Sequence, residues 1–158
     1  MSENPRVGIG KDFHEFSPNR KLIIGGVEIP NDMGLEGHSD GDPLAHAIID
    51  ALLGATHLGE IGDFFPSDDD RFKDASSMNL LEETVNQLSL ARWVIGNVDS
   101  IVVCSEIKLA DYKKDMEGTI AKILGLPAEE VSVKFKSNSE FDKKGISAEA
   151  IAVVSKIS

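Results

Sequence analysis

The chain contains little cysteine and no long apolar run. Its one cysteine, Cys104, cannot form an intramolecular disulfide or a cysteine-rich metal site. No apolar segment is long enough to span a bilayer, and Met1 to Arg6 is polar, unlike a signal peptide. We therefore expect a cytoplasmic protein, or a plastid stromal one if a transit peptide has been removed.

Positive charge is also scarce. There are 16 Lys and Arg residues against 27 Asp and Glu, which gives a net charge of -11. This balance argues against nucleic acid or a membrane surface as a partner. A phosphorylated ligand would need local cations, supplied by bound metal or by a few placed lysines.

The length of 158 residues and the 41% hydrophobic content fit one domain over residues 1–158, with no linker or repeat. Segments rich in Val and Ile predict strands. These are Arg6 to Phe13, Leu22 to Ile29 with a bend or bulge at Gly25-Gly26, Ile95 to Cys104, Val131 to Phe135, and Ala148 to Val154.

Three helices are predicted between these strands. The first opens at Asp42-Pro43 and ends near Leu53, because Asp is a good N-cap and Pro suits the first helical position. The second covers roughly Ser76 to Leu88, and the third runs from near Asp111 to Gly125. This pattern predicts an α+β fold, a mixed β-sheet with helices packed on one face and one hairpin near the N-terminus.

Candidate metal ligands occur at two places. Asp12 and His14 lie two residues apart on an extended segment and so share one face. His46 can project toward them from the first helix. Three such ligands leave one zinc position open for a reacting oxygen, which is typical of a catalytic site. The alternative is that these histidines only pack or face solvent.

Asp50 lies four residues after His46 on the same helical face. It can accept the hydrogen bond that orients a ligand imidazole, or it can be a solvated helix carboxylate. Gly8 and Gly10 do not open a dinucleotide loop, because position 13 is Phe where G-x-G-x-x-G needs its third glycine. No P-loop or G-x-S-x-G motif is present.

Several separated motifs, in order, make the chain resemble the 2-C-methyl-D-erythritol 2,4-cyclodiphosphate synthase family over almost its whole length. They are Gly10-x-Asp12-x-His14, Ile24-Gly25-Gly26-Val27-x-Ile29-Pro30, Gly37-His38-Ser39-Asp40-Gly41-Asp42 with His46, Asp50-Ala51-Leu52-Leu53-Gly54-Ala55, Leu58-Gly59-Glu60-Ile61-Gly62, Phe65-Pro66, Gly96-Asn97-Val98-Asp99 and Val131-Ser132-Val133-Lys134.

The resemblance implies a lyase that converts 4-diphosphocytidyl-2-C-methyl-D-erythritol 2-phosphate to the cyclic diphosphate and CMP in non-mevalonate isoprenoid biosynthesis. It implies a ferredoxin-like protomer of a homotrimer, with each active site shared between neighbouring subunits. Asp12, His14 and His46 match the family's catalytic zinc ligands. Glu140 matches the acidic ligand of a second cation, Mg²⁺ or Mn²⁺, which bridges the substrate phosphates.

The resemblance also assigns substrate contacts. His38, which is also a catalytic candidate, and Ser39 match a mobile loop that contacts the methylerythritol phosphate. Glu60, Ile61 and Gly62 match the stretch that binds the diol. Lys108 and Leu109 fall in the segment that receives cytosine, and Lys134 or Lys136 can neutralise phosphate.

Two departures from the family pattern keep other functions open. Glu60 stands where the family usually has Asp, and the segment from Phe141 to Gly145 lacks the family's arginine. A metal-dependent phosphohydrolase could use the same His and Asp residues to activate water. A catalytically impaired module that binds zinc or a cytidine nucleotide is the third alternative.

Overall fold

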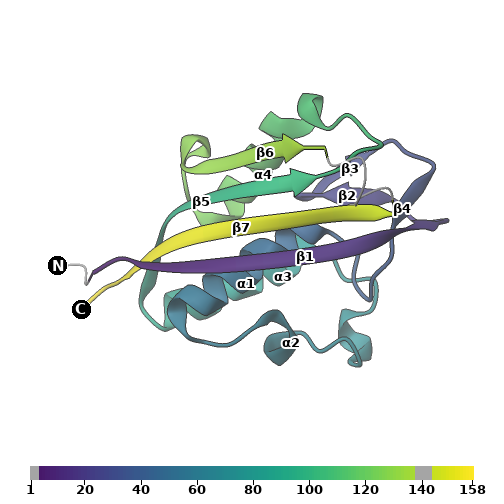
Figure 1. The fold of residues 1–158 in the computed structure, drawn as a ribbon. Helices are drawn as coiled ribbons and strands as arrows, with labels where there is room; N and C mark the ends of the chain where they lie inside the picture. The colour runs from purple at the N-terminus through teal and green to yellow at the C-terminus, as the bar shows by residue number, and fades with distance from the viewer. Residues whose placement is uncertain (1–3, 138–143) are drawn as a thin grey trace.

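A computed structural model describes residues 4–137 and 144–158 of the chain (Figure 1). Its centre is a five-stranded sheet in the order β4-β1-β7-β5-β6. The strands are β1 (Arg6–Pro18), β4 (Met33–Leu35), β5 (Trp93–Val103), β6 (Val131–Lys136) and β7 (Gly145–Lys156). β7 runs antiparallel to β1 and β5, whereas β5 and β6 are parallel. The predicted mixed sheet is confirmed.

The ferredoxin-like part of the prediction is wrong in its connectivity. A ferredoxin-like domain follows the order βαββαβ. Here the main elements run β1, α1, α3, β5, α4, β6, β7, and the last strand lies between β1 and β5. The reason is that α4 returns the chain to the same sheet edge and lays β6 parallel beside β5.

Helices α1 (Pro43–Thr56), α3 (Ser77–Leu90) and α4 (Lys113–Leu124) cover one face of the sheet (Figure 1). A short α2 (Ile61–Phe64) follows α1, and 3-10 turns lie at Asp70–Phe72, Ala110–Tyr112 and Ala128–Glu130. The inward residues of β7 alternate along the strand, as a half-buried strand requires. They are Ile146, Ala148, Ala150, Ala152 and Val154, all buried against the helices.

Asp42 fixes the start of α1. Its buried carboxylate accepts hydrogen bonds from the Ala45 N–H at 3.0 Å, the Gly25 N–H at 2.9 Å and the Gly26 N–H at 2.8 Å. The predicted cap is therefore present, and it also anchors the hairpin of β2 (Leu22–Ile24) and β3 (Val27–Ile29). Gly25 and Gly26 have φ of 59° and 77°, so this pair forms the hairpin turn and not a bend within one strand.

Close packing of α1 against β1 depends on glycine. A Cβ added at Gly10 would lie 1.9 Å from the Ala47 carbonyl oxygen, and one at Gly8 would lie 1.9 Å from the Ala51 carbonyl oxygen. Because no side chain intervenes, the helix backbone rests directly on the strand. This contact brings His46 to the part of β1 that carries Asp12 and His14.

The other face of the sheet carries exposed apolar side chains. Val7, Ile9 and Phe13 of β1 and Ile151 of β7 are 66%, 70%, 44% and 47% exposed. They occupy the strand positions that alternate with the buried ones. No helix in the described part of the chain is long and apolar enough to cross a membrane.

The two ends of the described chain lie side by side. Arg6 at the start of β1 pairs with Val154 near the end of β7. Both ends emerge at the same end of the sheet (Figure 1).

Candidate metal centre

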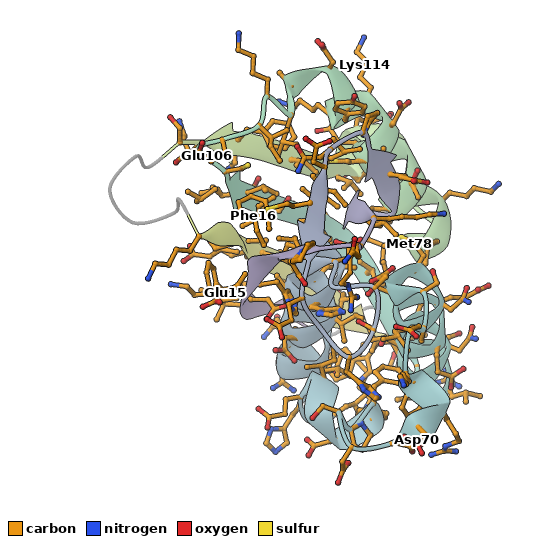
Figure 2. The ribbon with its side chains drawn as sticks, turned by 90° about the vertical axis from the view of Figure 1, so that its right-hand side faces the viewer. Glu15, Phe16, Asp70, Met78, Glu106 and Lys114 are labelled. Carbon is orange, nitrogen blue, oxygen red and sulfur yellow. The ribbon has the colours of Figure 1, made fainter. Side chains whose placement is uncertain are left out.

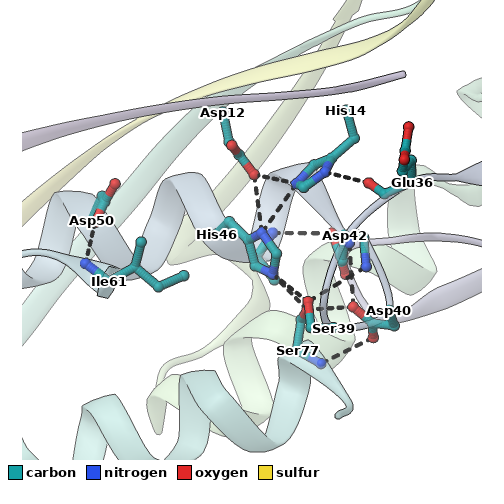
Figure 3. A network of polar contacts seen from close by, with 12 residues as sticks. Asp12, His14, Glu36, Ser39, Asp40, Asp42, His46, Asp50, Ile61 and Ser77 are labelled. Carbon is teal, nitrogen blue, oxygen red and sulfur yellow. Dashed lines mark hydrogen bonds and ion pairs between the residues drawn. The ribbon is translucent and has the colours of Figure 1, made fainter. Parts of the chain in front are cut away.

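Three side chains converge at the junction of β1 and α1 (Figure 3). The Asp12 Oδ2 atom lies 2.6 Å from His14 Nε2 and 3.0 Å from His46 Nδ1. The two histidine nitrogens are 3.2 Å apart. Asp12 and His14 share the inner face of β1, as their two-residue spacing predicted, and His46 projects from the first turn of α1.

The outer nitrogen of each imidazole has its own partner. His14 Nδ1 lies 2.6 Å from the Glu36 carbonyl oxygen, so this nitrogen donates. His46 Nε2 lies 2.8 Å from Ser77 Oγ and 3.1 Å from Ser39 Oγ. Each ring is therefore fixed by a hydrogen bond at its outer nitrogen, and its other nitrogen faces Asp12.

The three groups strongly affect one another's protonation. Burial opposes ionisation of Asp12, but hydrogen bonds and the charges of His14 and His46 prevail and lower its pKa to about 2. Burial also disfavours the charged form of His14, yet the hydrogen bond and charge of Asp12 raise the pKa of that imidazole. Asp12 is thus an anion at neutral pH, placed between two nitrogens.

The donor set fits a divalent cation such as zinc. One carboxylate oxygen and two imidazole nitrogens lie within 4.8 Å of one another. Tetrahedral zinc ligands about 2.0 to 2.2 Å from the metal are roughly 3.3 to 3.6 Å apart, so the pairs here, at 2.6, 3.0 and 3.2 Å, would open by up to about 1 Å to take the ion. Three protein ligands leave a fourth position for a substrate oxygen, which distinguishes a catalytic site from a structural one.

A cavity of about 300 Å³ opens beside this cluster. It brings together six of the predicted site residues, along with apolar side chains. The predicted residues are His14, His38, Ser39, His46, Ile61 and Gly62, and the others that line it are Phe65, Ser67, Phe72 and Leu80.

The loop that carries His38 and Ser39 is anchored at several points. The Arg20 guanidinium donates to the Gly37 carbonyl at 2.9 Å and to the Ser39 carbonyl at 2.6 Å. His38 Nε2 lies 2.8 Å from the Asp69 carbonyl oxygen. In this structure the loop is thus held on both sides, and the Ser39 hydroxyl lies 3.1 Å from His46 Nε2.

Of the two alternatives for Asp50, the one in which it orients His46 is not seen. Its carboxylate accepts a 2.7 Å hydrogen bond from the Ile61 N–H and so fixes the start of α2 (Figure 3). The helical spacing placed Asp50 on the correct face, but Ile61 lies closer than the imidazole. Glu60 is exposed, and its own N–H donates to Asp63 Oδ2 at 3.0 Å.

The remaining predicted residues that the structure describes do not line this cavity. Lys134 Nζ pairs with Asp99 Oδ2 at 2.7 Å on the outer sheet face. Lys136 and Lys108 are exposed, while Leu109 is buried. Figure 2 shows Glu106, from the loop that leads to Lys108, on the same side as Glu15 and Phe16 and away from Asp70. Glu140 lies outside the described residues.

Sequence reasoning missed Ser77 and Asp40. The Ser77 hydroxyl donates to Asp40 Oδ1, and the Ser77 N–H donates to Asp40 Oδ2 at 2.9 Å. Serine at the start of a helix is common as a cap, so its position alone gave no sign of a contact with a histidine 31 residues away.

Comparison with known proteins gives matches over nearly the whole chain. The YgbB family model matches residues 5–155. The 2-C-methyl-D-erythritol 2,4-cyclodiphosphate synthase of Syntrophomonas wolfei is 46% identical over 94% of this chain and 98% of its own length. The enzyme of that name from Cupriavidus pinatubonensis is 47% identical over 94% of this chain and 90% of its own length.

Solved structures agree. The bifunctional IspDF from Campylobacter jejuni matches 99% of this chain with a TM-score of 0.93 and 36% identity, and this chain covers 43% of that longer protein. A CDP complex of IspF from Plasmodium falciparum matches 98% of each chain with a TM-score of 0.83 and 28% identity. With the Asp12, His14 and His46 cluster at the position that the family motifs predicted, the chain belongs to the YgbB family of 2-C-methyl-D-erythritol 2,4-cyclodiphosphate synthases.

Proposed function

We propose that this chain cyclises 4-diphosphocytidyl-2-C-methyl-D-erythritol 2-phosphate. An oxygen of the substrate's 2-phosphate forms a bond to the β-phosphorus, the bond from that phosphorus to the α-phosphate oxygen breaks, and CMP leaves. Two observations support this proposal. The side chains of Asp12, His14 and His46 converge on one point, and the family model matches residues 5–155. The reaction needs no protein nucleophile, because positioning and charge neutralisation can carry phosphoryl transfer.

Asp12, His14 and His46 would hold zinc or another divalent cation. A cation bound there supplies a Lewis acid that polarises a phosphoryl oxygen and offsets the charge of the substrate. The protein's part is to present three ligands from two rigid elements and to leave one side open to the cavity. This local positive charge also explains how a chain of net charge -11 can accept a polyanion.

Other residues are proposed to position the substrate. His38 and Ser39 line the cavity next to the metal ligands and would contact the phosphate of the methylerythritol part. Ile61 and Gly62 also line the cavity, and the neighbouring Glu60, which is exposed, would reach the diol. The apolar Phe65, Phe72 and Leu80 exclude water, which favours internal attack over hydrolysis.

The cytidine side of the site is proposed to come from a second copy of the chain. Lys108, Leu109, Lys134 and Lys136 do not line the cavity around the metal ligands, so one chain provides only part of a pocket for the whole substrate. The exposed Val7, Ile9, Phe13 and Ile151 offer an apolar face for self-association. We therefore propose a homotrimer with shared sites, and a stable, active monomer in light scattering would contradict it.

A second cation, Mg²⁺ or Mn²⁺, is proposed to bridge the substrate phosphates, with Glu140 as its protein ligand. Magnesium is usually held by one or two carboxylates together with substrate phosphates, so a single glutamate suits this role. Glu140→Gln should raise the concentration of Mg²⁺ needed for half-maximal turnover and leave zinc content unchanged.

The activity is tested by incubating the zinc-loaded protein with the cytidine substrate in ¹⁸O-labelled water. ³¹P NMR should show the cyclic diphosphate and CMP in equal amounts, with no label in either product. A phosphohydrolase would instead place ¹⁸O in a phosphate product. Tight CMP binding without any product would identify an impaired binding module.

A further inference from the structure

His46 has a different environment at each of its two ring nitrogens (Figure 3). Nδ1 faces Asp12 Oδ2 at 3.0 Å and His14 Nε2 at 3.2 Å. Nε2 faces Ser77 Oγ at 2.8 Å. His46 can bind a cation through Nδ1 only in the neutral tautomer that carries its proton on Nε2. The hydrogen-bond partner of Nε2 therefore decides whether His46 can be a ligand.

Ser77 is fully buried at the start of α3 and makes two hydrogen bonds with Asp40. The Asp40 carboxylate accepts one hydrogen bond from the Ser77 hydroxyl and one from the Ser77 N–H. The Asp40 N–H in turn donates to the Ala75 carbonyl at 3.0 Å, which fixes the carboxylate beside the helix start.

The direction of these hydrogen bonds follows from counting protons. An ionised carboxylate only accepts, and a serine hydroxyl has a single hydrogen. That hydrogen goes to Asp40, so toward His46 the Ser77 oxygen can only accept. The proton between Ser77 and His46 must then belong to His46 Nε2, so Nδ1, which faces Asp12 and His14, is the nitrogen that can give up its proton and bind a cation.

We propose that Asp40 and Ser77 are positioning residues that hold His46 in its Nε2–H tautomer and thereby direct Nδ1 to the metal. This inference rests on the metal site of the proposed function. His14 has the opposite arrangement. Its Nδ1–H donates a hydrogen bond to the Glu36 carbonyl, so Nε2 is the nitrogen that faces Asp12. The two imidazoles thus reach one point through different nitrogens, each fixed by its outer partner.

Two variants test this chain of hydrogen bonds from Asp40 through Ser77 to His46, called the relay below. Ser77→Ala removes the hydroxyl oxygen that accepts the hydrogen bond from His46 Nε2. Asp40→Asn should reverse these hydrogen bonds. We expect its amide oxygen to stay with the Ser77 N–H, at 2.9 Å, and not with the Asp42 N–H, at 3.2 Å, so its NH₂ group faces the Ser77 hydroxyl, which then donates to His46 Nε2. Ser76→Ala is the matched control, because Ser76 is exposed and makes no side-chain hydrogen bond at the same helix start.

The first readout is whether His46 Nε2 carries a proton, taken from long-range ¹H–¹⁵N spectra of the metal-free protein, because Asp12 can hold a proton on Nδ1 in every variant. Wild type and Ser76→Ala should show Nε2–H. Asp40→Asn should show no proton on Nε2, and Ser77→Ala should show one in part of the molecules. Ser39→Ala should keep Nε2–H, because the Ser39 hydroxyl lies farther from that nitrogen, at 3.1 Å.

The second readout is the zinc dissociation constant, measured by competition with a chelator. Ser77→Ala and Asp40→Asn should weaken zinc binding about 10- to 100-fold, the usual effect of removing a partner of a metal-bound histidine. Unchanged tautomer and affinity in both variants would overturn the relay, as would an equal loss in Ser76→Ala. If wild type binds no zinc, the proposed function fails, while the tautomer measurement still decides the relay.

Discussion

Gly10→Ala tests the link between the packing of α1 on β1 and the metal site. The added Cβ would lie 1.9 Å from the Ala47 carbonyl oxygen, whereas real Cβ atoms essentially never approach closer than 3.0 Å. The strand and the helix must therefore separate by about 1.1 Å at this point. Its nearest obstacles are backbone atoms of Ala47 and Ala51, so no side-chain rotation can relieve the clash.

Two measurable losses follow. Overpacking of this severity should lower the free energy of unfolding by about 3 kcal/mol, the upper end of the usual range. His46 precedes Ala47 and would move with it, and metal ligands must be placed to within about 0.2 Å. We expect zinc affinity to fall roughly 100-fold, as for the most severe disturbances of a ligand's support.

Urea denaturation and chelator competition on the same preparation measure both effects. Gly54→Ala is the control on the same helix, because a Cβ there meets nothing within 4 Å. It should stabilise the protein by roughly 0.5 to 1 kcal/mol and leave zinc binding unchanged. If Gly10→Ala matched Gly54→Ala in both assays, the argument that glycine sets the distance between α1 and β1 would be wrong.

His46→Ala should lose bound zinc and cyclase activity but keep its fold, because the apolar core does not depend on the metal; elemental analysis and circular dichroism check this, and retained zinc and turnover would refute the site. Asp42→Ala should lower the free energy of unfolding by about 3 to 5 kcal/mol in urea denaturation, since three buried N–H groups lose their acceptor, while Asp42→Asn should cost less. Glu60→Asp should keep or raise turnover because it restores the family's usual residue, and an inactive but folded, zinc-loaded variant would show that Glu60 is locally adapted. Metal binding should release a proton, because Asp12 outweighs burial and raises the pKa of His14; zinc affinity should therefore fall as the pH drops through that pKa, measured by calorimetry in buffers of different ionisation enthalpy.

The candidate metal ligands could be predicted from the sequence because their signals are local. The D-x-H spacing fixes the shared face of Asp12 and His14, and the Asp42-Pro43 cap fixes where the helix that carries His46 begins. Both depend on a few neighbouring residues, and the family motifs then supplied the pairing of strand with helix.

Long-range partners could not be predicted in this way. Ser77 reaches His46 from a third element, and Asp50 meets an N–H that the chain presents eleven residues later. No spacing rule distinguishes these partners from solvent. The position of β7 between β1 and β5 was missed for a related reason, because pairing of distant strands depends on how helices return the chain to the sheet.

The neighbouring ends of β1 and β7 determine where a fused domain can be attached. Arg6 and Val154 are paired, and Asp12 lies six residues farther along β1, roughly 20 Å away at about 3.3 Å per strand residue. A partner tethered at either end therefore starts from the same end of the sheet, well away from the metal ligands. A linker at that end can carry another catalytic unit that starts about six strand residues from Asp12, an arrangement compatible with a two-enzyme chain.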